Sequence, residues 1–218
     1  GASGCDPLTG DGAGILMQVP DAFLRNVAPD SGIDLPDIHE YGTGLVFLPT
    51  DFHERRTIQE MFEDVVRQEG QEFLGWRQVP RNNSHIGYVA RDAEPAMKQV
   101  FIGRGKGMND ADAFERKLFI IRKRMERAVR NSDLRQQHFF YIPSLSHRLL
   151  NYKGLLLATQ VAEYYPDLKD PSMVSGIALV HQRYSTNTFP TWDLAQPFRF
   201  LCHNGEINTL RGNINWIN

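Results

Sequence analysis

The chain has 218 residues, a formal net charge of −2 and 41% hydrophobic residues. That length suits one domain or a large part of one, and the near-neutral charge gives no indication of nucleic acid or a membrane surface as a partner. No apolar run approaches the ~20 residues that cross a bilayer, and no signal-peptide pattern opens the chain. Two distant cysteines form neither a disulfide framework nor a set of metal ligands, so we expect a reducing compartment and no metal site in this segment.

The first part of the chain combines a glycine-rich start with short apolar strands. Residues 1–14 contain five glycines; this loop either brings its backbone close to a ligand or is an ordinary glycine turn. A helix is predicted from about residue 51 to Gly70, because apolar residues recur on one helical face. Strands are predicted at 15–19, 43–48, 72–79 and 97–102.

Two basic features follow. Gly103-Arg104-Gly105-Lys106-Gly107 lacks the Ser or Thr that follows the lysine of a P-loop, so it is either a weaker phosphate-binding loop or a flexible surface loop. The next helix begins at Asp110 or Asp112 and runs to about Val129. Its many Arg and Lys residues indicate either a solvated face or a docking surface for an acidic partner or another domain.

The last third of the chain mixes strands and helices in no strict βαβ order, which favours an α+β fold over a doubly wound parallel sheet. A strand is predicted at 138–142, a helix at 155–164, an apolar core strand at 177–180 and a strand-like segment at 198–202.

Two stretches near the end carry the chemistry: His181-Gln182-Arg183-Tyr184-Ser185-Thr186-Asn187-Thr188, and His203-Asn204-Gly205-Glu206-Ile207. Strand alternation puts Leu179, His181 and Arg183 on one face, where an arginine at a strand end can hold a carboxylate with its two-pronged guanidinium. The Asn204-Gly205 turn can aim a side-chain amide and a backbone N–H at one point, as an oxyanion hole requires. Together they indicate acyl transfer on an amino-acid-like substrate.

These stretches resemble the glutamine-binding core of class II, N-terminal nucleophile, glutamine amidotransferases. The long form, HQRYSTNTFPTWDLAQPFRFLCHNGEINTLRGN, is similar to one branch, the amidotransferase domain of the glutamate synthase large subunit. Gly4–Ile15 and Ala113–Leu118 agree with that branch too, so the resemblance spans essentially all 218 residues. It implies the four-layer αββα sandwich of N-terminal nucleophile hydrolases, with residues 1–218 forming most of one such domain.

The resemblance also implies residue roles. Asn204 and Gly205 match the oxyanion hole, Arg183 matches the residue that holds the substrate α-carboxylate, and Thr186 and Asn187 fall in the loop that lines the glutamine pocket. The family's nucleophile is a cysteine at the first position, whose own α-amine moves the proton. Here Gly1 stands first and Cys5 is internal, so we expect the nucleophile strand, and a later aspartate that binds the substrate α-amine, to lie outside this segment, which alone is expected to be inactive.

For the full-length enzyme, the resemblance implies that L-glutamine is hydrolysed to glutamate and ammonia, and that other domains of the same polypeptide transfer the ammonia reductively to 2-oxoglutarate. It implies FMN and an iron–sulfur cluster there and no cofactor in this segment. The electron donor would be a small subunit or ferredoxin, and the compartment the cytosol, or a plastid in a plant or alga.

Two other functions stay open. One is a self-contained cysteine hydrolase that uses Cys202 or Cys5 with His203 or His181. It is disfavoured because a cysteine inside a strand has no evident base held by a third group, and histidines at strand ends are commonly structural. The other is a non-catalytic interaction module of the same fold that docks through the basic helix at 114–130.

Overall fold

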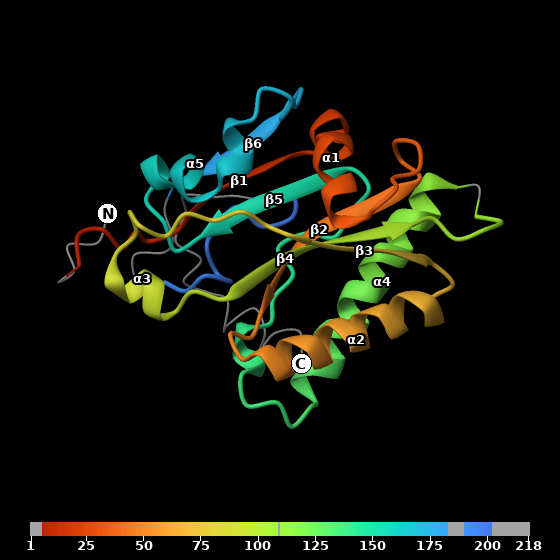
Figure 1. Ribbon diagram of the computed structural model, residues 1–218, viewed down its shortest axis with the longest axis horizontal. Helices are drawn as coiled ribbons and strands as arrows, with labels where there is room; N and C mark the ends of the chain where they lie inside the picture. Colours follow the sequence, from red (N-terminus) through yellow and green to blue (C-terminus); the bar gives the residue numbers. More distant parts are fainter. Residues whose placement is uncertain (1–5, 109, 183–189, 202–218) are drawn as a thin grey trace, which may run out of the picture.

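Two three-stranded antiparallel sheets form the frame of the structure, a computed structural model that describes residues 6–108, 110–182 and 190–201 (Figure 1). The first sheet has the order β5-β1-β6 and the second the order β2-β4-β3. The strands are β1 (Ala13–Gln18), β2 (Tyr41–Leu48), β3 (Glu72–Gln78), β4 (Ala96–Gly103), β5 (Leu149–Gly154) and β6 (Ala178–His181). Along the chain, helices lie between the strands of two separate antiparallel sheets, which agrees with the predicted α+β class.

The helices of the described residues are α1 (Asp21–Val27), α2 (Phe52–Gln68), α3 (Tyr88–Asp92), α4 (Ala111–Arg130) and α5 (Val161–Tyr164), with 3-10 turns η1 (Pro29–Ser31), η2 (Gln137–Phe139), η3 (Ala158–Gln160) and η4 (Pro166–Lys169). Of the two predicted caps for α4, Asp110 is the N-cap, and its carboxylate accepts from the Asp112 backbone N–H at 2.9 Å. None of these helices is long and apolar enough to span a bilayer.

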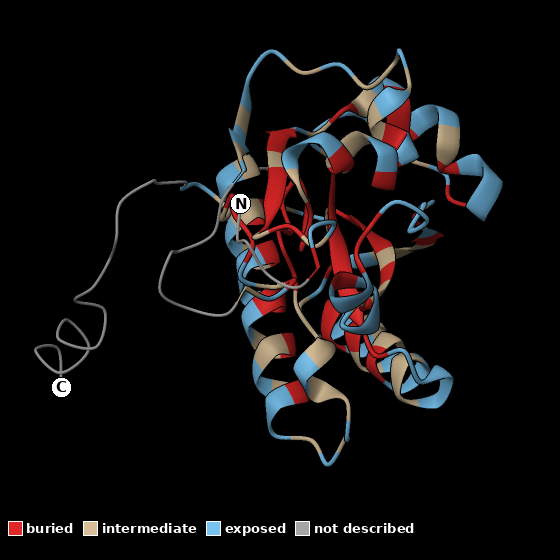
Figure 2. Cartoon of the chain, turned by 90° about the vertical axis from the view of Figure 1, so that its left-hand side faces the viewer, coloured by how far each residue is buried: buried red, intermediate tan, exposed pale blue. Residues whose placement is uncertain are grey.

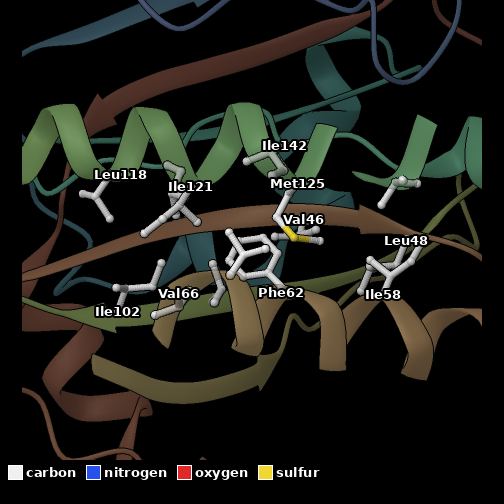
Figure 3. Close-up of a cluster of buried hydrophobic side chains, with 14 of the residues drawn as sticks. Val46, Leu48, Ile58, Phe62, Val66, Ile102, Leu118, Ile121, Met125 and Ile142 are labelled. Carbon is white, nitrogen blue, oxygen red and sulfur yellow. The ribbon is translucent and has the colours of Figure 1, made fainter. Parts of the chain in front are cut away.

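The two long helices cover one face of the sheet β2-β4-β3. Their apolar stripes point toward one another and toward the strands, and Figure 3 shows Phe62 of α2 and Met125 of α4 meeting near Val46 of β2. Each fully buried side chain of this size contributes about 1.5–3 kcal/mol. Both predicted helices are confirmed. The face that is buried on each helix is the one that its apolar periodicity predicts.

The other face of that sheet packs against the first sheet. Leu45 and Phe47 of β2 share a buried cluster with Leu150 and Tyr152 of β5. Figure 2 shows the buried residues concentrated on the strands and on the inward faces of the helices. The first sheet is therefore held against the second by apolar side chains from both.

Of two predicted elements in the last third, one is wrong and the other is shorter than predicted. Residues 138–142 form no strand: η2 ends at Phe139, and Tyr141 makes an isolated bridge to Phe47. In the helix predicted at 155–164, residues 155–157 are not helical, η3 covers 158–160, and α5 covers the last four residues. Here the Gln160 side chain accepts from Leu157 N–H at 2.8 Å and donates to two backbone carbonyls far away in sequence, at 2.9 and 2.8 Å. These contacts hold the preceding residues outside a helix.

Two further expectations need correction. Residues 198–201 form a tight turn rather than a strand: the Phe198 N–H donates to Leu201 O at 2.8 Å and the Leu201 N–H donates to Phe198 O at 3.1 Å. The apolar strand at 177–180 is not a core strand. It becomes β6, whose one partner among the described strands is β1, and Ile177 and Val180 are 73% and 65% exposed.

Candidate active site

The five residues predicted to bind and activate glutamine lie outside the described residues. These are Arg183, Thr186 and Asn187 in one stretch and Asn204 and Gly205 in another, and their roles stay predictions. Cys5, Cys202 and His203, which the cysteine-hydrolase alternative requires, also lie outside. The structure does describe the two segments that lead into these stretches, namely β6 with Gln182, and residues 190–201, which we call the connecting segment.

Strand β6 leads directly toward Arg183. It pairs antiparallel with β1, and His181 lies opposite Gly14. Leu179 and His181 are half-buried, whereas Ala178 and Val180 are exposed, so the predicted alternation is confirmed for the two of its three residues that are described. Strand β1 thus determines the position at which the chain enters the Arg183 stretch.

A cavity of about 850 Å³ lies beside β6. Its walls come from β1, β6 and the segment 158–173, and its described lining is apolar except for His181 and Gln182. Its volume is in the range of small-molecule sites. The charged groups of an amino acid need ionic partners, which this apolar lining does not supply; Arg183 follows Gln182 directly in sequence and is predicted to supply one.

The connecting segment is anchored to β5 and to the short helices α3 and α5 by its backbone and side chains. The indole N–H of Trp192 donates to Ala90 O at 2.9 Å, and its ring centroid lies 5.4 Å from that of Tyr164. The Asn151 amide in β5 donates to Pro197 O at 2.8 Å. This segment joins the Arg183 stretch to the Asn204 stretch in sequence, and these contacts hold it against the described part of the fold.

Two glycines of the glycine-rich start make room for the connecting segment. Gly12 has φ +111°, a backbone conformation that favours glycine. A Cβ at this position would lie 3.0 Å from the Ala195 Cβ. A Cβ on Gly14 would lie 2.6 Å from the Lys153 Cβ and 2.9 Å from Gln196 O. At these two positions the backbone closely approaches another part of the same chain. The sequence analysis considered only a close approach to a ligand or an ordinary glycine turn.

Sequence reasoning missed the polar residues of β5 that face the connecting segment. Lys153 and Asn151 are both fully buried. Burial, helped by the nearby positive charge of Arg199 and opposed by Asp193, lowers the pKa of Lys153 from 10.5 to about 7. The available signal was the run Leu149-Leu150-Asn151-Tyr152-Lys153-Gly154-Leu155, where two polar residues alternate within an otherwise apolar strand.

The other basic features identified in the sequence serve internal contacts. In the loop at 103–107, the Gly105 N–H donates to the Gln71 side chain at 2.9 Å and Arg104 pairs with Glu40. These two donors are therefore already engaged within the protein and are less available to a phosphate. On α4, Lys117 and Arg124 both pair with Glu69, the C-cap residue of α2, at 2.8 and 2.6 Å. These pairs favour a structural role for this helix face over docking.

Comparison with known proteins gives one consistent result. The family model of class II glutamine amidotransferases matches residues 1–218. The chain is 50% identical over 217 residues to the glutamate synthase [NADPH] large chain of Bacillus subtilis (strain 168) and 45% identical over 218 residues to that of Azospirillum brasilense. It is 40% identical over 217 residues to ferredoxin-dependent glutamate synthase 2, chloroplastic, of Arabidopsis thaliana.

These alignments cover 100% of this chain and 13–14% of each relative, so the chain spans about a seventh of their length. The match is continuous from the glycine-rich start through both candidate stretches. The chain belongs to the class II glutamine amidotransferases.

Proposed function

We propose that this chain is the glutamine-hydrolysing part of a glutamate synthase, which releases ammonia from L-glutamine for reductive transfer to 2-oxoglutarate. The observation that carries this proposal is the match of the whole chain to glutamate synthases of bacteria and a plant at 40–50% identity. At this identity over the whole chain, fold and site are expected to be shared. A non-catalytic interaction module is the runner-up, and the internal ion pairs of α4 weaken it.

The proposed chemistry assigns each predicted residue one task. Arg183 holds the α-carboxylate of glutamine, while Thr186 and Asn187 line its pocket. A cysteine outside this segment attacks the side-chain amide carbon, a C–S bond forms and the C–N bond breaks, and ammonia leaves with a proton carried by that cysteine's α-amine. Asn204 and Gly205 donate hydrogen bonds to the oxyanion, and water then hydrolyses the thioester to glutamate.

For the fold, we propose the four-layer αββα sandwich, with residues 1–218 forming most of one domain. Support comes from the contact of Leu45 and Phe47 with Leu150 and Tyr152 between the sheets, and from α2 and α4 on an outer face. The short helices η3 and α5 supply part of the cavity wall beside the first sheet, where a fourth layer would lie.

FMN and an iron–sulfur cluster are assigned to other parts of the longer protein. Such clusters are commonly held by four thiolates, and this chain has two cysteines, so its residues do not fit that cofactor. An electron-donating subunit or ferredoxin would act there too. We propose the cytosol as its compartment, or the chloroplast if the protein is from a plant, as the name of the Arabidopsis thaliana relative indicates for that protein.

The experiment is to label the full native protein with a glutamine-like diazo-ketone and to map the adduct by mass spectrometry. An adduct on a cysteine at the mature N-terminus would support the amidotransferase mechanism. An adduct on Cys202 or Cys5 would instead support the cysteine hydrolase. A protein without any adduct and without an N-terminal cysteine would support the interaction module.

A further inference from the structure

A buried lysine reaches from β5 into the connecting segment. The Lys153 ammonium group donates to the backbone carbonyls of Asp193 and Ala195, both at 2.7 Å. It also lies 4.6 Å from the ring centroid of Tyr141 and 4.7 Å from that of Phe198. Both rings offer a negative π face to a cation. These four contacts favour the charged form of the ammonium group, whereas burial and the positive charge of Arg199 disfavour it.

This arrangement is expensive for a residue that only fills space. Its acceptors among the described residues are carbonyls rather than carboxylates, and a buried charge without a counter-charge costs several kcal/mol before its hydrogen bonds are counted. A methionine would fill the same volume without that penalty. The charge therefore has to be explained by what it holds in place.

What it holds is the backbone of the connecting segment. Asn151 lies two residues before Lys153, so strand alternation places both side chains on the same face of β5. The Asn151 amide donates to Pro197 O at 2.8 Å. Side chains of one rigid strand therefore bind the carbonyls of residues 193, 195 and 197. The connecting segment runs between the Arg183 stretch and the Asn204-Gly205 turn, with both attached to its ends by a few residues.

We propose that Lys153 is a positioning residue of the glutamine site: it holds against β5 the connecting segment, which joins Arg183 to the Asn204-Gly205 turn in sequence. This inference rests on the proposed function of those residues. A displacement of about 1 Å at such a site can lower turnover by about 100-fold. The lysine touches no substrate in this proposal, and its effect passes through the backbone it binds.

The proposal includes a dependence on pH. The charged groups that act on Lys153 are Arg199 and Asp193, both on the connecting segment; the adjoining Tyr141 is influenced in turn by Arg122 and Glu126 of α4. As pH rises through about 7, the ammonium group loses its proton. The neutral amine keeps two N–H donors for the two carbonyls and no longer places a charge in a buried site. Because the pKa is 10.5 for an exposed lysine and about 7 here, opening of the segment takes up a proton between these pH values, so opening becomes less favourable as pH rises.

The test uses the full-length protein with Lys153→Met, and Lys98→Met as its matched control. Lys98 is a partly buried lysine in β4 of the other sheet, and burial lowers its pKa too. Two quantities are measured: kcat and KM for glutamine hydrolysis, and hydrogen exchange of the backbone amides in residues 190–201. We expect Lys153→Met to lower kcat/KM at least ~10-fold and to speed this exchange, and Lys98→Met to do neither.

Unchanged exchange in Lys153→Met would overturn the proposal, as would faster exchange with unchanged kcat/KM. A wild-type protein without any glutaminase activity would instead refute the proposed function, and the exchange result would still decide whether Lys153 holds the segment. If Lys153→Met does not fold, the wild type serves. Exchange in residues 190–201, corrected for its intrinsic pH dependence, should fall relative to β4 as pH rises from about 7 toward 10.5, and a constant ratio would refute the proposal.

Discussion

Arg77 of β3 and Asp167 of η4 form a buried two-pronged ion pair, with both Nη–Oδ distances at 2.8 Å. The Tyr152 hydroxyl of β5 donates to the same carboxylate at 3.0 Å, and Arg77 also donates to Gln99 at 3.1 Å. One carboxylate thus links the two sheets. Removing half of a buried pair leaves an unpaired charge in a dry environment.

We expect Asp167→Asn to lower the free energy of unfolding by about 3–5 kcal/mol, because Arg77 keeps its charge and loses its counter-ion. Asp64→Asn is the control: Asp64 pairs with Arg67 at 3.4 Å on an exposed helix face, where a pair contributes at most about 1 kcal/mol. Urea denaturation measures both. A loss below about 1 kcal/mol in Asp167→Asn would show that the pair is not important for stability.

Arg183→Ala is expected to raise KM for glutamine and to leave kcat less affected, since it removes the partner of the substrate carboxylate. The loss should be about 2–5 kcal/mol if the ion pair is desolvated. Arg183→Lys, which keeps the charge without the planar fork, should fall between the two. Arg130→Ala, at the exposed end of α4, should behave as wild type. An unchanged KM in Arg183→Ala would refute the assignment.

Asn204→Ala should act on the opposite parameter. An oxyanion donor is used mainly in the transition state, so kcat is expected to fall about 100-fold or more with little change in KM. Steady-state glutaminase assays of the full-length protein separate the two effects. If kcat stays within a factor of about three of wild type, the Asn204-Gly205 turn is a hairpin feature without a catalytic role.

Lys153 also predicts how stability changes with pH. Its pKa is about 7 in the folded protein and 10.5 ordinarily, so between these values the unfolded chain binds more protons than the folded chain. Stability of the wild type relative to Lys153→Met should therefore rise as pH increases from about 7 to about 10, by up to about 5 kcal/mol. Urea denaturation across this range measures it, and a flat difference would show that the lysine titrates normally.

The correct and incorrect sequence predictions differ in where their determinants lie. Helices α2 and α4 were predictable because the apolar stripe and the capping Asp51 and Asp110 belong to the helix itself or its first turn. The helix predicted at 155–164 is shortened at its start, where Gln160 bonds to the carbonyls of Leu8 and His85. Local periodicity cannot report contacts with residues that far away.

The same reason separates the parts of the candidate site. Arg183 and the Asn204-Gly205 turn stand out in the sequence because their residue types and spacing carry recognisable chemistry. Lys153 does not, because its role depends on the carbonyls of Asp193 and Ala195, some forty residues later in the chain. The exposure of Val180 could not be predicted either, because an apolar strand has the same sequence pattern at the edge and in the centre of a sheet.

The pairing of β1 has a consequence for biosynthesis. Ala13 pairs with Gly154, and Met17 with Ala178, so both described neighbours of this strand are encoded more than a hundred codons after it. At ~5–20 residues per second, the ribosome releases β1 on the order of ten seconds before its partners. During that interval an apolar strand has both edges unpaired, and we expect it to be the part of the nascent chain that most needs protection by a chaperone.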